Sequence, residues 1–164
     1  MDRHAELTRY ELSFRDMLMA QRSLNLAEKA DDYEHRSVFL DMAAIAYARP
    51  FVKNFVTVGW AVLKIEALFD DPMSDEDLTL HRLVLQLRNS VIAHSDAEMA
   101  RTYETAIKGV IVFGTAISSI TDLQPHLPRF AHLVAAVRRT LADKINAIES
   151  ELGDDLIPPD RWKG

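Results

Sequence analysis

The chain has 164 residues, of which 48% are hydrophobic and 27% are charged, as is ordinary for one soluble globular domain. Its formal net charge of −6 argues against a protein that coats nucleic acid with a broad basic surface, but not against an enzyme that engages a few phosphates through local cations. The absence of cysteine excludes disulfides, zinc ribbons and thiol nucleophiles. No apolar run of about 18 residues and no apolar signal core are present, so we expect a cytoplasmic protein with no membrane partner.

Apolar residues at helical spacing predict a first helix over about His4 to Ala30. Asp32 is expected to cap a second helix, because an aspartate side chain accepts bonds from free first-turn N–H groups. Pro50 removes one donor from that helix, but Phe51 and Phe55 keep a helical spacing of four residues after it. We therefore expect a kinked continuation to about Thr57.

A short helix is expected within Trp60–Ala67, ended by Phe69–Pro72. Ser74–Asp77 then has the pattern of a helix cap followed by an acidic first turn. The third helix should continue from there to His94, with an apolar stripe formed by Leu80, Leu83, Val84, Leu87 and Val91.

Residues 101–117 change from helical spacing to β-branched and aromatic residues around Lys108-Gly109, which suits a tight turn. We predict a β-hairpin, with a continued helix as the alternative. Because an isolated hairpin is marginal in water, it is expected to lie against the helices.

The last helix is expected to begin near Pro128 and to end near Leu152, with Gly153 as its cap. The sequence therefore predicts a mainly α fold, in which a bundle of four long helices carries a short hairpin between the third and fourth. Residues 1–153 should form one domain, and residues 154–164 a loose tail.

The end of the third helix carries the residues with the most specific chemistry, Arg88-Asn89 and His94-Ser95. An arginine supplies a permanent cation, and a histidine moves protons near neutral pH. Together they suffice for cleavage of a phosphodiester by its own 2′-hydroxyl. His94 would act as general base or acid, Arg88 would stabilise charge on the non-bridging oxygens, and Asn89 or Ser95 would orient His94 or the phosphate.

Arg88 and His94, with the asparagine directly after the arginine, resemble the Arg-x(4–6)-His signature of the HEPN superfamily. The resemblance implies a HEPN-like helical fold and a metal-independent endoribonuclease that needs no cofactor. It also implies a toxin or phage-defence effector with RNA as substrate and a cognate antitoxin as a possible partner. HEPN ribonucleases pair their motifs at a dimer interface.

Helical geometry bears on that dimer. His94 is six positions after Arg88, which places the two residues about 120° apart around an ideal helix and about 9 Å apart along it. One helix therefore does not close both side chains on one phosphate. Either the helix loosens near Ala93, or two copies of the helix meet across a two-fold axis in a homodimer.

Simpler interpretations remain open for this motif. Arg88 could be a solvated helix arginine, and His94 a hydrogen-bonded histidine at the edge of the core. A non-catalytic HEPN-like module that binds a nucleotide or a partner protein is the alternative function.

A second segment, Ala46–Asn54, resembles part of the second helix of bacterial HEPN-like proteins from abortive-infection and toxin–antitoxin systems. Arg49, Lys53 and Asn54 would form a polar, cationic stripe for RNA phosphate. The alternative is that Arg49 pairs with an acidic neighbour while Pro50 shapes the bundle. A metal site is a weaker possibility, and its candidate ligands are His35, Asp77, His81 and His132.

Overall fold

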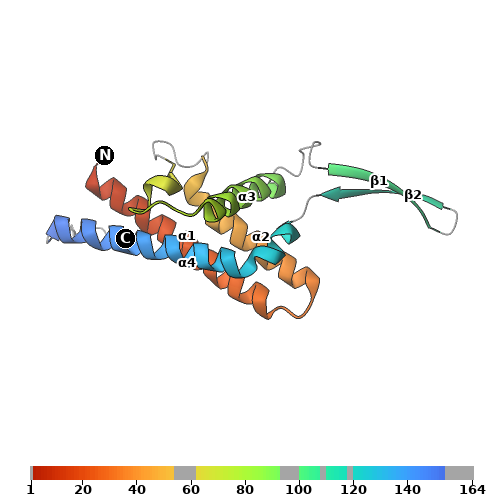
Figure 1. The fold of residues 1–164 in the computed structure, drawn as a ribbon, viewed down its shortest axis with the longest axis horizontal. Coiled ribbons are helices and arrows are strands. Elements are labelled where there is room, and N and C mark those ends of the chain that lie inside the picture. The colour runs from red at the N-terminus through yellow and green to blue at the C-terminus, as the bar shows by residue number, and fades with distance from the viewer. Residues whose placement is uncertain (1, 54–61, 93–99, 108–109, 118–119, 154–164) are drawn as a thin grey trace, which may run out of the picture.

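A computed structural model describes residues 2–53, 62–92, 100–107, 110–117 and 120–153. The fold is mainly helical (Figure 1). Its long helices are α1 (Arg3–Lys29), α2 (Tyr33–Ala48), α3 (Asp75–Ile92) and α4 (Leu127–Leu152). Helix α1 packs against both α2 and α4, and α3 packs against α2.

Aspartate side chains begin the first two helices. Asp2 accepts a hydrogen bond from the backbone N–H of His4 at the start of α1. Asp32 accepts one from the backbone N–H of His35, over 2.8 Å, at the start of α2. The predicted Asp32 cap is confirmed, and the short connection between the helices makes them antiparallel neighbours.

Helix α2 ends before Pro50, contrary to the predicted kinked continuation. Ala48 is its last residue, a 3₁₀ turn covers Arg49–Phe51, and Val52 is extended at φ −124° and ψ 151°. Proline has no N–H to donate, and its ring clashes with the carbonyl four residues earlier. The spacing of Phe51 reflects packing in the core rather than a continued helix. Residues 54–57 lie outside the described residues.

Helix α3 begins at the predicted cap. The Ser74 hydroxyl accepts from the backbone N–H of Asp77 over 3.1 Å and donates to the Asp77 carboxylate over 2.7 Å. Before it, the expected short helix is a 3₁₀ turn at Ile65–Ala67. The helix is described to Ile92, so its predicted extension to His94 lies outside the described residues.

Strands β1 (Ala100–Ile107) and β2 (Val110–Ile117) pair antiparallel, with Thr102 opposite Thr115. The predicted turn residues 108–109 lie outside the described residues. Figure 1 shows the two strands projecting away from the helices. The expectation that they lie against the bundle is therefore wrong, because it assumed that a two-stranded ribbon takes its support from its own chain.

Helix α4 follows a 3₁₀ segment, Ile120–His126, and has Pro128 in its first turn. Its predicted end is confirmed at Leu152, where Gly153 has φ +55° and ψ −138°, a conformation that side chains disfavour. Residues 154–164 lie outside the described residues.

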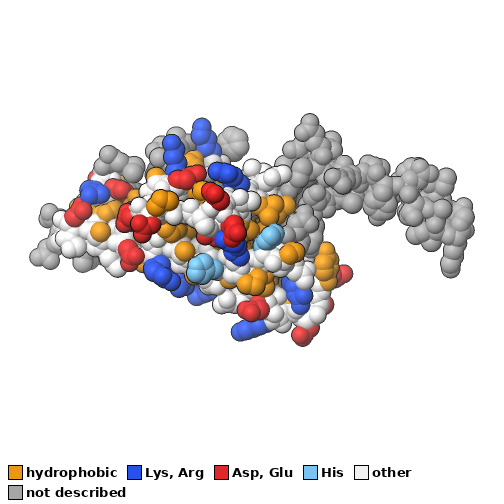
Figure 2. Space-filling view, in the orientation of Figure 1, with side chains coloured by type: hydrophobic (Ala, Val, Ile, Leu, Met, Phe, Trp, Pro, Cys, Tyr) orange, Lys and Arg blue, Asp and Glu red, His pale blue; other side chains and the backbone are white. Residues whose placement is uncertain are grey.

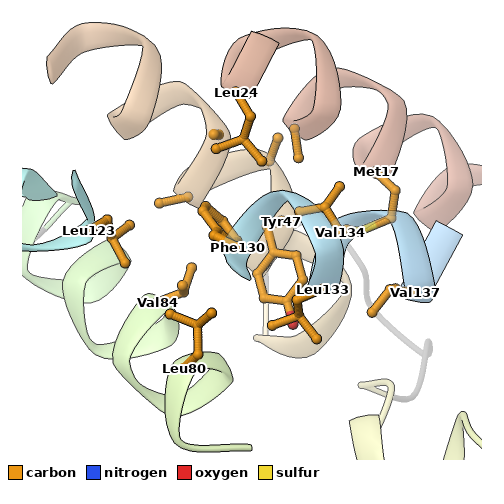
Figure 3. Close-up of a cluster of buried hydrophobic side chains, with 14 of the residues drawn as sticks. Met17, Leu24, Tyr47, Leu80, Val84, Leu123, Phe130, Leu133, Val134 and Val137 are labelled. Atoms are coloured by element: carbon orange, nitrogen blue, oxygen red, sulfur yellow. The ribbon is translucent and has the colours of Figure 1, made fainter. Parts of the chain in front are cut away.

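All four long helices contribute to one apolar core (Figure 3), in which the fully buried Tyr47 and Phe130 rings meet edge to face at 5.3 Å. Around them lie Met17, Leu24, Leu80, Val84, Leu123, Leu133, Val134 and Val137. Among the described residues, no helix has the length and apolar character needed to cross a bilayer.

Candidate active site

Arg88 and Asn89 lie near the end of α3, where the Arg88 Nη1 donates a hydrogen bond of 3.1 Å to the Asn89 side-chain oxygen. Leu87, just before them, is buried and holds this turn against the core. Arg88 is half-buried and Asn89 is exposed. The Arg88 Nε is covered and has no hydrogen-bond partner within the described part of the chain.

The predicted partners of Arg88 cannot be placed beside it. His94, expected to move the proton, and Ser95, expected to orient it, lie outside the described residues. The structure thus positions one half of the predicted motif, the arginine and the amide.

Arg49 is engaged in an ion pair. Its guanidinium donates over 3.1 Å to the Asp16 carboxylate of α1, which is the acidic pairing that the alternative interpretation expected. Burial raises the pKa of Asp16, although Arg49 and Arg9 oppose that rise. Lys53 is exposed, and Asn54 lies outside the described residues.

Arg88 and Arg49 lie on opposite sides of one contact between α2 and α3. The two helices run in opposite directions (Figure 1), and Tyr47 of α2 meets His81 of α3. Arg49 is two residues beyond Tyr47, and Arg88 is seven beyond His81. At 1.5 Å per residue the backbones of the two arginines are separated by about 13 Å along the helix direction.

His81 is a core residue. Its Nδ1 and the Tyr47 hydroxyl share a hydrogen bond of 2.9 Å, and its ring packs edge-on against Phe51 at 4.9 Å. Burial lowers the pKa of His81 to about 4 and raises that of Tyr47. His81 is therefore neutral at pH 7. Sequence reasoning missed this bond because Tyr47 and His81 are 34 residues apart and no spacing rule joins them.

The weaker metal interpretation gains no support. Asp77 binds Ser74 and Arg129, and His35 is exposed and bonded to Asp32. His132 is exposed on α4. Within the described ranges, no three His, Asp or Glu side chains are grouped so as to hold a metal ion.

A pocket of about 390 Å³ lies where the first turns of α3 and α4 meet, at the other end of α3 from Arg88. Its cation, Arg129, is bound by Ser74, Glu76 and Asp77. Acidic and basic side chains are interspersed over the face of the bundle in Figure 2. The remaining lining residues are Asp75, Thr79, Leu80, Leu83 and His126.

Comparison with protein-family models, with curated proteins and with solved structures found no match for this chain.

Proposed function

We propose that this chain is a metal-independent HEPN-type endoribonuclease with a HEPN-like fold, acting as a toxin or phage-defence effector that a cognate antitoxin restrains. The proposal rests on the Arg88-Asn89 and His94-Ser95 pattern in the sequence. The mainly helical fold and the position of Arg88 near the end of α3 support it.

One observation carries the proposal furthest: the half-buried Arg88 keeps its charge uncompensated among the described residues. Its hydrogen-bond partner there is Asn89, a neutral amide. By contrast, Arg49 is paired with Asp16, and Arg129 with Glu76 and Asp77. A partly desolvated guanidinium that has no acidic partner among the described residues suits an anionic ligand, because its planar fork can bind two phosphate oxygens at once.

The reaction is attack of an RNA 2′-hydroxyl on the adjacent phosphorus. His94, as general base, takes the hydroxyl proton while the bond to phosphorus forms. The bond from phosphorus to the 5′-oxygen breaks, and that oxygen receives a proton from a general acid, the second histidine of a paired motif or water. Arg88 stabilises the charge on the non-bridging oxygens, and Asn89 keeps its guanidinium in place. The products are a 2′,3′-cyclic phosphate and a free 5′-hydroxyl.

A homodimer completes the site in this proposal. Arg88 and His94 diverge by about 120° on an ideal helix, so a two-fold axis beside α3 would let two motifs enclose one phosphate. Lys53 and Asn54 would contact the RNA away from the phosphate that is cleaved. Arg49 would contribute less than its charge suggests, because Asp16 already binds it.

Cleavage of a fluorogenic RNA oligonucleotide by purified variants tests the proposal. We expect Arg88→Ala and His94→Ala each to reduce cleavage at least 100-fold, a typical loss for such groups. Arg82→Ala is the matched control, because Arg82 is an exposed arginine on the same helix. Wild-type rates in His94→Ala would overturn the proposal.

A further inference from the structure

The exposed apolar surface of this chain is concentrated on its first two helices. Every large hydrophobic side chain that is exposed, among those the structure describes, lies on α1 or α2. Five of them form what we term the outer face: Leu12, Met19 and Leu26 on α1, and Val38 and Met42 on α2, each 40–54% exposed. Clustered exposed apolar side chains mark an interaction surface.

The spacing on α1 is that of a helix-packing seam. Leu12, Met19 and Leu26 recur at intervals of seven residues, so they lie in one row along the helix. On α2, Val38 and Met42 are four apart and share a side. The ion pair between Asp16 and Arg49 bridges the two helices.

A row of cations borders the outer face on the α1 side. Arg15, Arg22 and Lys29 each follow a member of the apolar row by three residues, which places them about 60° around the helix. All three are exposed, and none makes an ion pair with another described residue. Asp16, which points to α2, is four residues after Leu12 and therefore lies on the other side of the apolar row.

Acidic residues border the outer face on the α2 side. Glu34 and Asp41 are seven residues apart and therefore lie on the same side of α2. Around the helix axis they are about 60–80° from Arg49, which faces α1. Val38 lies between these two acidic residues and Arg49. The face thus has one basic edge and one acidic edge.

We propose that a second copy of this chain packs on the outer face, with α1 over the α2 of its partner. A two-fold axis parallel to the helices sets the basic edge of each copy against the acidic edge of the other. An axis across the helices would instead set basic edge on basic edge. The favoured arrangement makes all neighbouring helices antiparallel, as in a four-helix bundle.

The levels of the charges agree with this arrangement. Within the chain, Asp16 of α1 is paired with Arg49, the residue directly after α2, so the two lie at the same height along the helices. The numbers of any two α1 and α2 residues at one height, or level, therefore add to about 65. Lys29 and Glu34 therefore lie within about 3 Å of one level, as do Arg22 and Asp41. Rotation about an axis parallel to the helices does not change the height of a residue along them, so it sets Lys29 beside the partner's Glu34. This interface uses a different face from the α3 contact of the proposed ribonuclease and does not depend on that function.

Cross-linking of the full-length chain tests the proposal, because the chain has no cysteine of its own. Two single-cysteine variants are prepared, Lys29→Cys and Glu34→Cys, and one of them carries a tag. The two proteins are mixed at micromolar concentration and treated with a short bismaleimide. We expect the mixed product to exceed either self-linked product at least fivefold. Replacing Glu34→Cys with Glu149→Cys, an exposed position on α4, should remove the preference.

A second variant separates loss of the interface from loss of folding. Met19→Glu in the Lys29→Cys chain should reduce the mixed product at least fivefold while the circular-dichroism melt stays close to that of the parent. The proposal would be overturned if self-linked Lys29→Cys formed in the same yield as the mixed product. It would also be overturned if the mixed product did not exceed that of the Glu149→Cys control, and the outer face would then be left to a different protein.

Discussion

The Tyr47 hydroxyl oxygen lies 2.9 Å from Nδ1 of His81, and this buried hydrogen bond joins α2 to α3 inside the aromatic part of the core. Tyr47 is fully buried and His81 is 7% exposed, so this hydrogen bond is largely shielded from water. The bond lies two helical turns before Arg88 on α3 and therefore helps fix how that helix presents it.

Tyr47→Phe removes the hydroxyl and leaves the His81 nitrogen buried without a partner. We expect the free energy of unfolding to fall by about 1–3 kcal/mol. Tyr33→Phe is the control, because Tyr33 is 61% exposed and its change should stay within about 0.5 kcal/mol. Urea denaturation followed by circular dichroism measures both values, and equal effects would contradict the role of this bond.

Stability should depend on pH through His81. Burial lowers the pKa of His81 from 6.5 to about 4 in the folded chain, so between these values the unfolded chain binds the proton and the folded chain does not. The contribution of neutral His81 to the free energy of unfolding is fully present above about pH 6.5. It is lost as the pH falls toward 4, by about 3 kcal/mol in total.

His81→Gln keeps a hydrogen-bonding group but has no proton to titrate in this range. Urea denaturation at pH 7 and pH 4.5 should therefore show a smaller loss of stability in His81→Gln than in the wild type. The same loss in both chains would show that other groups cause the pH dependence.

The cap of α3 should be worth about 1 kcal/mol. Ser74→Ala removes the acceptor for the Asp77 N–H, whereas Ser74→Asp supplies another. We expect the alanine variant to lose about 1 kcal/mol in urea denaturation and the aspartate variant to stay near the wild type. A loss of the same size in Ser74→Asp would instead point to the contacts of Ser74 with Arg129 and Asp77.

Arg88→Lys should lose most of the cleavage activity expected of the wild type. A lysine ammonium is a point charge and does not reproduce the forked contact of a guanidinium with two phosphate oxygens. RNA cleavage by equal amounts of the two chains measures the effect, and thermal melts control for folding. Full activity in Arg88→Lys would mean that Arg88 supplies charge alone.

Local chemistry made much of the fold predictable. Helix ends depend on single residues: the side chains of Asp32 and Ser74 cap the starts of α2 and α3, and Gly153, which has no side chain, follows the end of α4. The structure has each of them at the predicted helix end. The end of α2 was mispredicted because Phe51 keeps helical spacing while packing in the core after a proline. Two contacts between distant segments, Tyr47 with His81 and Asp16 with Arg49, have no signature in spacing.

The candidate site was predictable only as a list of residues. The sequence singles out Arg88 and Asn89, and the structure adds that they bond to each other and that Arg88 is half-buried. The ion pair of Arg49 depends on where α1 packs, which no pattern near Arg49 encodes.

The proposed function requires that His94 and Arg88 cleave RNA through its 2′-hydroxyl without a metal. Mass spectrometry of an RNA oligonucleotide after incubation with the wild type and with His94→Ala, both in EDTA, tests it most directly. We expect 2′,3′-cyclic phosphate and 5′-hydroxyl ends from the wild type, and intact RNA from His94→Ala and from a 2′-deoxy substrate. Cleavage that EDTA abolishes and manganese or zinc restores, or equal cleavage by His94→Ala, would contradict it.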